Sequence, residues 1–290
     1  MNTDVLNMNR FGRYLVTDIK NAIARYGVSL LVMATISLTG YLLVGFFTMI
    51  VGGGWHSLGE AGRLFFMGIS FVVLTITAPA KIYGFITDKK EGSSYLMVPA
   101  SSLEKTISMI LVCCVILPLA FFAVYLSLDQ IVCLIDGNCG ESLLAAISNG
   151  QNILTDAFHK ISLESENVIP DYSSLATPWM YLDDIAQGFL VFLVGALIFK
   201  SSKPAKTVGC LILLSIVLSM ITTPIIMHGA IERFKDAAAM ENMTPEELFQ
   251  SFPFLAWSMK HAVLLDFLSD TIVNIGLAIA IYFRVRKIKH

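Results

Sequence analysis

Six apolar runs, separated by charged segments, constrain this sequence more than any other feature. They fall at about residues 28–50, 62–83, 106–128, 179–199, 207–227 and 262–283. A helix crosses the ~30 Å hydrocarbon core of a bilayer with about 20 apolar residues, so each run is long enough. Charged residues make up 14% of the chain, against about 25% in soluble domains. The sequence therefore predicts an all-α, polytopic membrane protein with six transmembrane helices.

The positions of the basic residues predict the orientation of these spans. Most of the 20 lysines and arginines lie in four segments: the N-terminal 27 residues, the loop after the second run, the loop after the fourth, and the C-terminal tail. Cytoplasmic segments of membrane proteins carry an excess of Lys and Arg. We therefore expect both termini to be cytoplasmic.

The chain is predicted to form a single transmembrane domain over residues 1–290, with six parts in sequence order. They are an amphipathic interfacial helix at 1–27, spans one to three at 28–128, a cytoplasmic loop at 84–105 within them, an extracytoplasmic loop at 129–178, spans four to six at 179–283, and a basic tail at 284–290.

Residues 1–27 have no continuous apolar core, so they do not resemble a signal peptide. Phe11, Leu15, Ile19, Ala22 and Tyr26 follow helical spacing instead. A basic amphipathic helix before a first span is typical of an interfacial helix, with its apolar stripe in the headgroup region. The alternative is a helix that packs on other loops of the protein.

The two outer loops are predicted to contain short helices that lie over the outer face. In the first, Cys133 and Cys139 stand where oxidation is permitted, so they form either a small disulfide loop or two unpaired thiols. In the second, Thr244 and the following Pro and Glu residues favour a helix start. An apolar piece at 251–262, interrupted by Pro253, follows and is expected to dip into the outer leaflet.

Acidic residues enter the outer third of two predicted spans. Asp183 and Asp184 lie in the fourth, and Asp266 and Asp270 lie in the sixth, with Asn274 on the same helical face. Because charges in a membrane are costly and usually face water or a bundle interior, these residues are candidates for an outer, hydrated vestibule. The alternative is that the helices begin later and the aspartates sit at headgroup level.

Catalytic and nucleotide-binding signatures are absent from the sequence. It has no phosphate-binding loop of the GxxxxGK[ST] type, no HExxH, no CxxC pair and no GxSxG, and its five histidines lack metal-ligand spacing. No basic patch of the kind that binds nucleic acid is present. We therefore expect a protein that is not an enzyme and holds no cofactor or metal of its own.

The loop between the second and third spans reads "DKKEGSSYLMVPASSLEK" at 88–105, and its centre is apolar. Gly92 interrupts the chain, and the following serines favour a short helix that carries Tyr95, Leu96 and Met97. Pro99 disfavours helical geometry in the residue before it and so ends this helix.

Ser101 and Glu104 follow with the spacing of a capping box, which predicts the start of the third span. A short helix with an exposed apolar edge is suited to a groove on a partner protein. Packing of this edge beneath the N-terminal helix is the alternative.

The stretch "FITDKKEGSSYLMVPASSLEK" resembles the cytoplasmic loop of ABC-2-type transporter permeases, and "MNRFGRYLVTDIKNAIARYG" resembles the amphipathic helix that opens such permeases. The resemblance implies an exporter subunit in the bacterial inner membrane, working as a permease homo- or heterodimer. ATP would be bound by a separate ATPase subunit, against which the loop would dock. The matching positions are Gly92, Tyr95, Leu96, Met97, Pro99, Ser101 and Glu104.

The outer loop at 129–178 is longer than in many permeases of this type, and nothing in the sequence identifies a substrate. Two other functions therefore remain open. One is a membrane scaffold or sensor-associated protein without transport. The other is an ion-coupled carrier or intramembrane enzyme that uses Asp266 and Asp270.

Overall fold

The computed structural model describes residues 7–52, 54–55, 58–87, 92–136, 139, 142–145, 178–234 and 262–288. Within these ranges all regular secondary structure is helical. The longer helices are α1 (Met8–Ala34), α2 (Ile36–Ile50), α3 (Glu60–Tyr83), α5 (Ser102–Leu111), α6 (Leu117–Ile135), α8 (Pro178–Ile198), α9 (Lys203–Phe234) and α12 (Ala262–Lys287). Shorter segments are the 3₁₀ turn η1 (Gly84–Thr87), the helix α4 (Gly92–Met97) and the π-helical turn η2 (Val112–Ile116).

Five segments of the described residues contain helices long and apolar enough to cross a membrane: Met8–Ile50, Gly62–Thr87, Ser102–Ile135, Lys203–Pro224 and Phe267–Lys287. They correspond to five of the six predicted spans. The remaining run, 179–199, coincides with α8, a helix of 21 residues. The length and composition of these helices indicate an all-helical membrane protein. The count of six spans stays a prediction.

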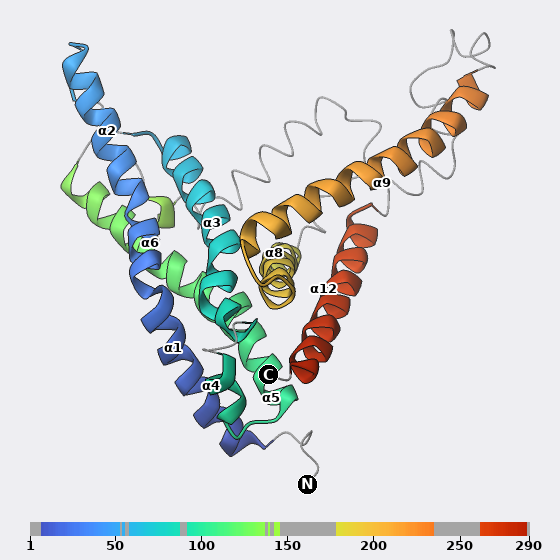
Figure 1. The fold of residues 1–290 in the computed structure, drawn as a ribbon. Coiled ribbons are helices and arrows are strands. Elements are labelled where there is room, and N and C mark those ends of the chain that lie inside the picture. Colours follow the sequence, from blue (N-terminus) through green and yellow to red (C-terminus); the bar gives the residue numbers. More distant parts are fainter. Residues whose placement is uncertain are drawn as a thin grey trace.

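The first span differs from the prediction. α1 continues through residue 27 to Ala34 and is followed after Thr35 by α2, so 1–27 and 28–50 do not form two separate helices. Figure 1 shows α1 and α2 as one long rod along one side of the molecule. The 43 residues from Met8 to Ile50 extend about 65 Å at the rise of an α-helix, roughly twice the hydrocarbon thickness. Only the second half of this rod, residues 28–50, is continuously apolar, so hydropathy alone predicts the first span there.

Aromatic side chains connect the helices at the centre of the core. Phe71 on α3 lies with its ring centroid 5.2 Å from Phe122, 5.7 Å from Phe121 and 5.9 Å from Phe189 on α8. Such offset and edge contacts add to the burial of apolar area. α8 packs against α3, α9 and α12, and Figure 1 shows it between the α1–α2 rod and α12.

The π-helical turn η2 interrupts the third span directly before Leu117 and Pro118. Proline has no backbone N–H, so the i→i−4 ladder cannot continue through Pro118, and a π turn is a common local adjustment. The missing N–H of Pro118 thus accounts for the loosened turn before it.

One end of the bundle is formed by the start of α1, by η1 and α4, and by the start of α5; we call it the α4 end. The last residues of α12 lie there too, against α5 (Figure 1). The start of α1 and the end of α12 therefore share one end of the bundle. The first predicted outer loop begins a helical turn at 143–145, and the rest of the two loops, 146–177 and 235–261 with the apolar piece before the last span, lies outside the described residues.

Candidate functional site

The structure contains the predicted short helix as α4. Met97 at its end has 82% of its surface exposed, and Val98 and Pro99 after it are also exposed. Gly92 and Tyr95 are buried, whereas the side chain of Leu96 lies outside the described residues. Among the side chains of this segment that the structure describes, the exposed ones are at its tip, around Met97 and Pro99, and Tyr95 is not part of an exposed edge.

Tyr95 fixes α4 to the rest of the bundle. Its ring packs edge-on against Phe85 of η1, with the centroids 6.4 Å apart, and the Lys105 ammonium lies 4.5 Å from the Tyr95 centroid. Lys105 Nζ also donates a hydrogen bond of 2.8 Å to the Tyr95 carbonyl oxygen. Burial raises the pKa of Tyr95 well above its usual value. The interior of α4 is thus attached to η1 and to the first turn of α5.

Glu104 is fully buried and connects the start of α5 to the start of α1. The predicted capping box is confirmed: Ser101 Oγ accepts from Glu104 N at 3.1 Å, and Ser101 N donates to Glu104 Oε2 at 2.9 Å. The same carboxylate accepts from Arg10 Nε and Nη2, each at 2.8 Å, and from the backbone N–H of Asn7 at 2.9 Å. Ser101 and Glu104 are therefore structural anchors of the α4 segment and do not belong to its exposed surface.

Asp18 forms a second buried connection at this end, and the sequence reasoning missed it. Its Oδ2 atom accepts hydrogen bonds from Tyr83 Oη at 2.9 Å and from Ser108 Oγ at 2.5 Å. One side chain of α1 thus bonds to both α3 and α5. The sequence carries a signal for it, because polar residues recur on one face of α1 at spacings of three and four.

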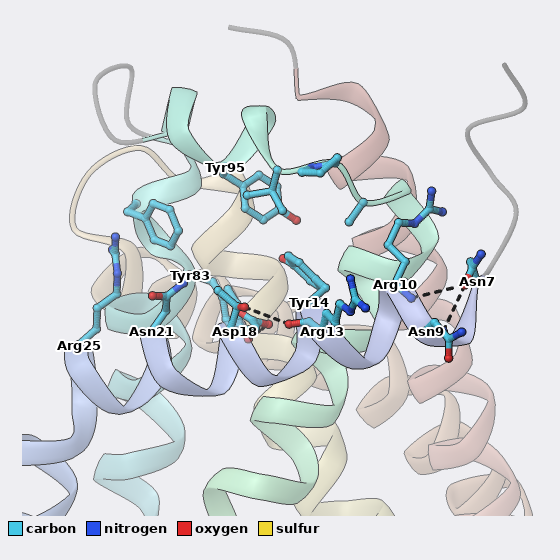
Figure 2. A pocket seen from close by; sticks show the side chains of 15 residues that line it. Asn7, Asn9, Arg10, Arg13, Tyr14, Asp18, Asn21, Arg25, Tyr83 and Tyr95 are labelled. Carbon is cyan, nitrogen blue, oxygen red and sulfur yellow. Dashed lines mark hydrogen bonds between the residues drawn. The ribbon is translucent and has the colours of Figure 1, made fainter.

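That polar face of α1 lines a groove of about 900 Å³ at the α4 end. Figure 2 shows the α1 side chains from Asn7 to Arg25 along one wall, with Tyr95 reaching in from α4 on the other. Val98, Pro99 and Ala100 complete the far wall. We call this the α1–α4 groove. Of the α1 residues that line it, Tyr14 and Asp18 are buried, whereas the arginines stay exposed. The interfacial position of this helix stays a prediction.

The acidic residues of α8 and α12 come together in part. Asp183 accepts hydrogen bonds from Asn274 Nδ2 at 2.7 Å and from Thr271 Oγ1 at 3.0 Å, and Asp270 Oδ1 accepts from Gln187 Nε2 at 3.0 Å. These bonds join the two helices along a polar seam.

The Asp184 side chain is exposed, and the side chain of Asp266 lies outside the described residues. Among the residues that the structure describes, no three His, Cys, Asp or Glu side chains are grouped to hold a metal ion. The outer vestibule stays a prediction.

The opposite end of α3 carries a buried ion pair. Arg63 Nη1 lies 3.0 Å from Asp129 Oδ1 on α6, and both side chains are 2% exposed. Arg63 Nη2 donates to the Cys139 carbonyl at 3.2 Å, and Asp129 Oδ2 accepts from the Leu143 N–H at 2.7 Å. The structure joins Cys133 to Cys139 in a disulfide, with the Cα atoms 5.1 Å apart. We call this cluster the Arg63 clasp.

Comparisons of the chain with protein-family models, with curated proteins and with solved structures find no match.

Proposed function

We propose that this chain is the permease subunit of an ABC-2-type exporter, which moves a substrate across the bacterial inner membrane with ATP hydrolysed by a separate subunit. One observation carries the proposal. A helix of six residues ends in an exposed Met97, and its base is held by Phe85 of η1 and by the buried Lys105 of α5. Anchoring of this kind suits a helix that receives a push from a partner.

The contacts at the base define a path for such a push. Displacement of α4 would move Lys105 and the first turn of α5 through the Tyr95 carbonyl and ring. The same turn holds α1 through the Glu104–Arg10 pair. Two permease chains with two ATPases, and both termini in the cytoplasm, complete the proposed arrangement.

The proposal is tested by co-purification. The tagged chain is expressed in its own host, and the eluate is assayed for a P-loop ATPase subunit and for ATP hydrolysis. Met97→Asp should abolish the association, because it puts a charge at the centre of an apolar contact. Met8→Asp is the matched control, since Met8 is 73% exposed at the same end of the bundle. If no ATPase accompanies the wild-type chain, the proposal is wrong and the scaffold function is favoured.

The polar seam between α8 and α12 favours one alternative, an ion-coupled carrier. Asp270→Asn, alone and combined with Asp266→Asn, should eliminate transport by such a carrier. A permease should lose only part of its activity, because Asp270 then serves only to hold α8 against α12 through Gln187.

A further inference from the structure

We propose that a groove between α8 and α12 binds one anionic phospholipid, with an acyl chain among its apolar side chains and the phosphate at Arg284 and Lys287. The groove has a volume of about 360 Å³, within the ~300–1,000 Å³ of small-ligand sites. We call it the α8–α12 groove, and its function does not depend on an ATPase partner. Its apolar lining is Val194, Leu197 and Ile198 of α8 with Ala280, Ile281 and Phe283 of α12.

The groove is formed where α8 and α12 lie side by side and run in the same direction. Near one end of this pair, Asn274 Nδ2 donates to Asp183 Oδ1 at 2.7 Å, and near the other, Arg284 Nε donates to the Leu197 carbonyl at 2.9 Å. The groove lies at the second of these ends, which is the α4 end of the bundle (Figure 1). Because two helices form its walls, it is a shaped site and not the flank of a single helix.

The polarity of the groove changes along its length as it does along a phospholipid. Ala280, Ile281 and Phe283 lie within the apolar part of the span Phe267–Lys287, whereas Arg284 and Lys287 are in its last turn. A span of this length places its last turn at the boundary between hydrocarbon and headgroups. Arg and Lys side chains there extend their charge to the headgroups and cover apolar surface with their stems. A lipid in the groove would therefore have its chain beside Phe283 and its phosphate beside Lys287.

The charges of the groove favour an anion. Two cations and no carboxylate line it among the residues that the structure describes. Arg284 bonds to the Leu197 carbonyl through Nε alone, so its two terminal nitrogens keep N–H donors for a phosphate. Lys287 lies three residues further on the same helix face and forms no hydrogen bond or ion pair with a described residue. The C-terminal dipoles of α8 and α12, about −0.5 charge each, do not balance two full cations.

An anionic lipid fits this combination better than a soluble anion or a second copy of the chain does. A soluble phosphate would leave the apolar walls of the groove uncovered. A second copy related by a two-fold axis at the groove would bring the same two cations, Arg284 and Lys287, against each other. Basic pockets between membrane helices bind anionic lipid headgroups in the same way.

Binding is tested by native mass spectrometry of the full-length protein in an uncharged detergent, after removal of lipid that purifies with it. One arm titrates phosphatidylglycerol, and a second titrates phosphatidylcholine with the same acyl chains. A third titrates glycerol 3-phosphate, which has the anionic group without a chain. One phosphatidylglycerol should bind saturably and about fivefold more tightly than phosphatidylcholine, because only its net charge is negative. Glycerol 3-phosphate should not bind at the same concentrations.

Two substitutions, each with a matched control, locate the site. Lys287→Gln should weaken phosphatidylglycerol binding about fivefold. Arg286→Gln removes the same charge from an exposed neighbour outside the lining and should leave the affinity unchanged. Ala280→Phe fills the apolar part of the groove and should weaken the binding of both lipids, whereas Ile279→Phe puts the same ring on an exposed neighbour outside it. All four positions except the groove lining contact are exposed to the bilayer or water, so the thermal unfolding midpoints without lipid should match the wild type.

Four results would overturn the proposal. The first is lipid that adds without saturation or preference, as at an ordinary lipid-facing surface. The second is an equal loss of binding in Lys287→Gln and Arg286→Gln, which would indicate a general effect of charge. The third is glycerol 3-phosphate that binds as tightly as phosphatidylglycerol, because the occupant would then be a soluble anion. The fourth is a protein dimer without bound lipid that Ale280→Phe dissociates, because a second copy would then cover the groove.

Discussion

Buried carboxylates lie near both ends of α3, but their cationic partners differ in exposure. At one end, Arg63 and Asp129 are both almost fully buried and bond to each other and to the backbone of residues 139 and 143. At the other end, Glu104 is buried but its partner Arg10 is 45% exposed, and an open groove lies beside them. The Arg63 clasp is closed on itself, whereas the α4 end has an exposed ion pair and an open groove. The difference predicts that changes at the two ends have different consequences.

The largest expected effect is at the Arg63 clasp. Asp129→Asn leaves the Arg63 guanidinium buried without a counter-charge, which should lower the free energy of unfolding by about 3–5 kcal/mol. Thermal unfolding of the purified protein in detergent measures the loss. Gln130→Ala, an exposed neighbour on the same helix, should unfold like the wild type. Equal thermal unfolding midpoints for the two variants would show that the Asp129–Arg63 ion pair does not stabilise the fold.

Removal of the disulfide should have the next largest effect. Cys133→Ser with Cys139→Ser opens a short covalent loop beside the clasp, at a cost of about 2 kcal/mol in the chain-entropy account. Addition of a reductant to the wild type should lower the thermal unfolding midpoint as much as the double substitution does. Cys210→Ser, which changes an exposed free thiol, is the control. A wild-type midpoint that does not respond to reductant would contradict the prediction.

A smaller effect is expected at Glu104. Glu104→Gln keeps the size of the side chain but weakens charge-assisted bonds to Arg10 and to two backbone N–H groups, so about 1–2 kcal/mol should be lost. The Arg10 bond contributes modestly because solvent screens its exposed half.

Glu104→Gln should also release the start of α1, so trypsin should cleave after Arg10 faster than in the wild type. A double variant with Arg10→Gln should lose less than the sum of the two single losses, because the two residues share one interaction. Additive losses would show that the pair is not coupled.

The smallest expected effect is at the tip of α4. Met97→Asp should change the stability by no more than about 0.5 kcal/mol, since its side chain is exposed and packs on little. Under the proposed function, the same variant should also fail to retain an ATPase subunit on co-purification. A large drop in the unfolding midpoint would show that the tip is part of the fold and would remove the basis for a docking surface.

Features that depend on neighbours in sequence could be predicted well. The capping box of Ser101 and Glu104 spans three residues, and the short helix before it is bounded by glycine and proline. The loosened helix before Pro118 follows from a missing N–H. The lengths of the apolar runs follow from the thickness of the bilayer. Each of these features depends on residues close in sequence or on the thickness of the bilayer.

The partners of the charged side chains could not be predicted in the same way. Arg10 and Glu104 are 94 residues apart, and Asp18 and Ser108 are 90 apart. In the sequence, Asp18 is one polar residue of an amphipathic segment, and Arg63 is one cation at the start of an apolar run. Their burial depends on which helices are adjacent, and that depends on how all the apolar faces pack at once.

The sequence by itself determined that this chain is helical and membrane-embedded, with a short punctuated helix between its second and third predicted spans. Only the tertiary structure decided that the base of this helix is buried, that Met97 is its exposed tip, and that the polar face of α1 lines a groove behind it. The physical reason is that hydropathy and capping act over a few residues or against a uniform solvent. The pairing of buried polar groups depends on contacts between segments that the chain brings together only when it is packed.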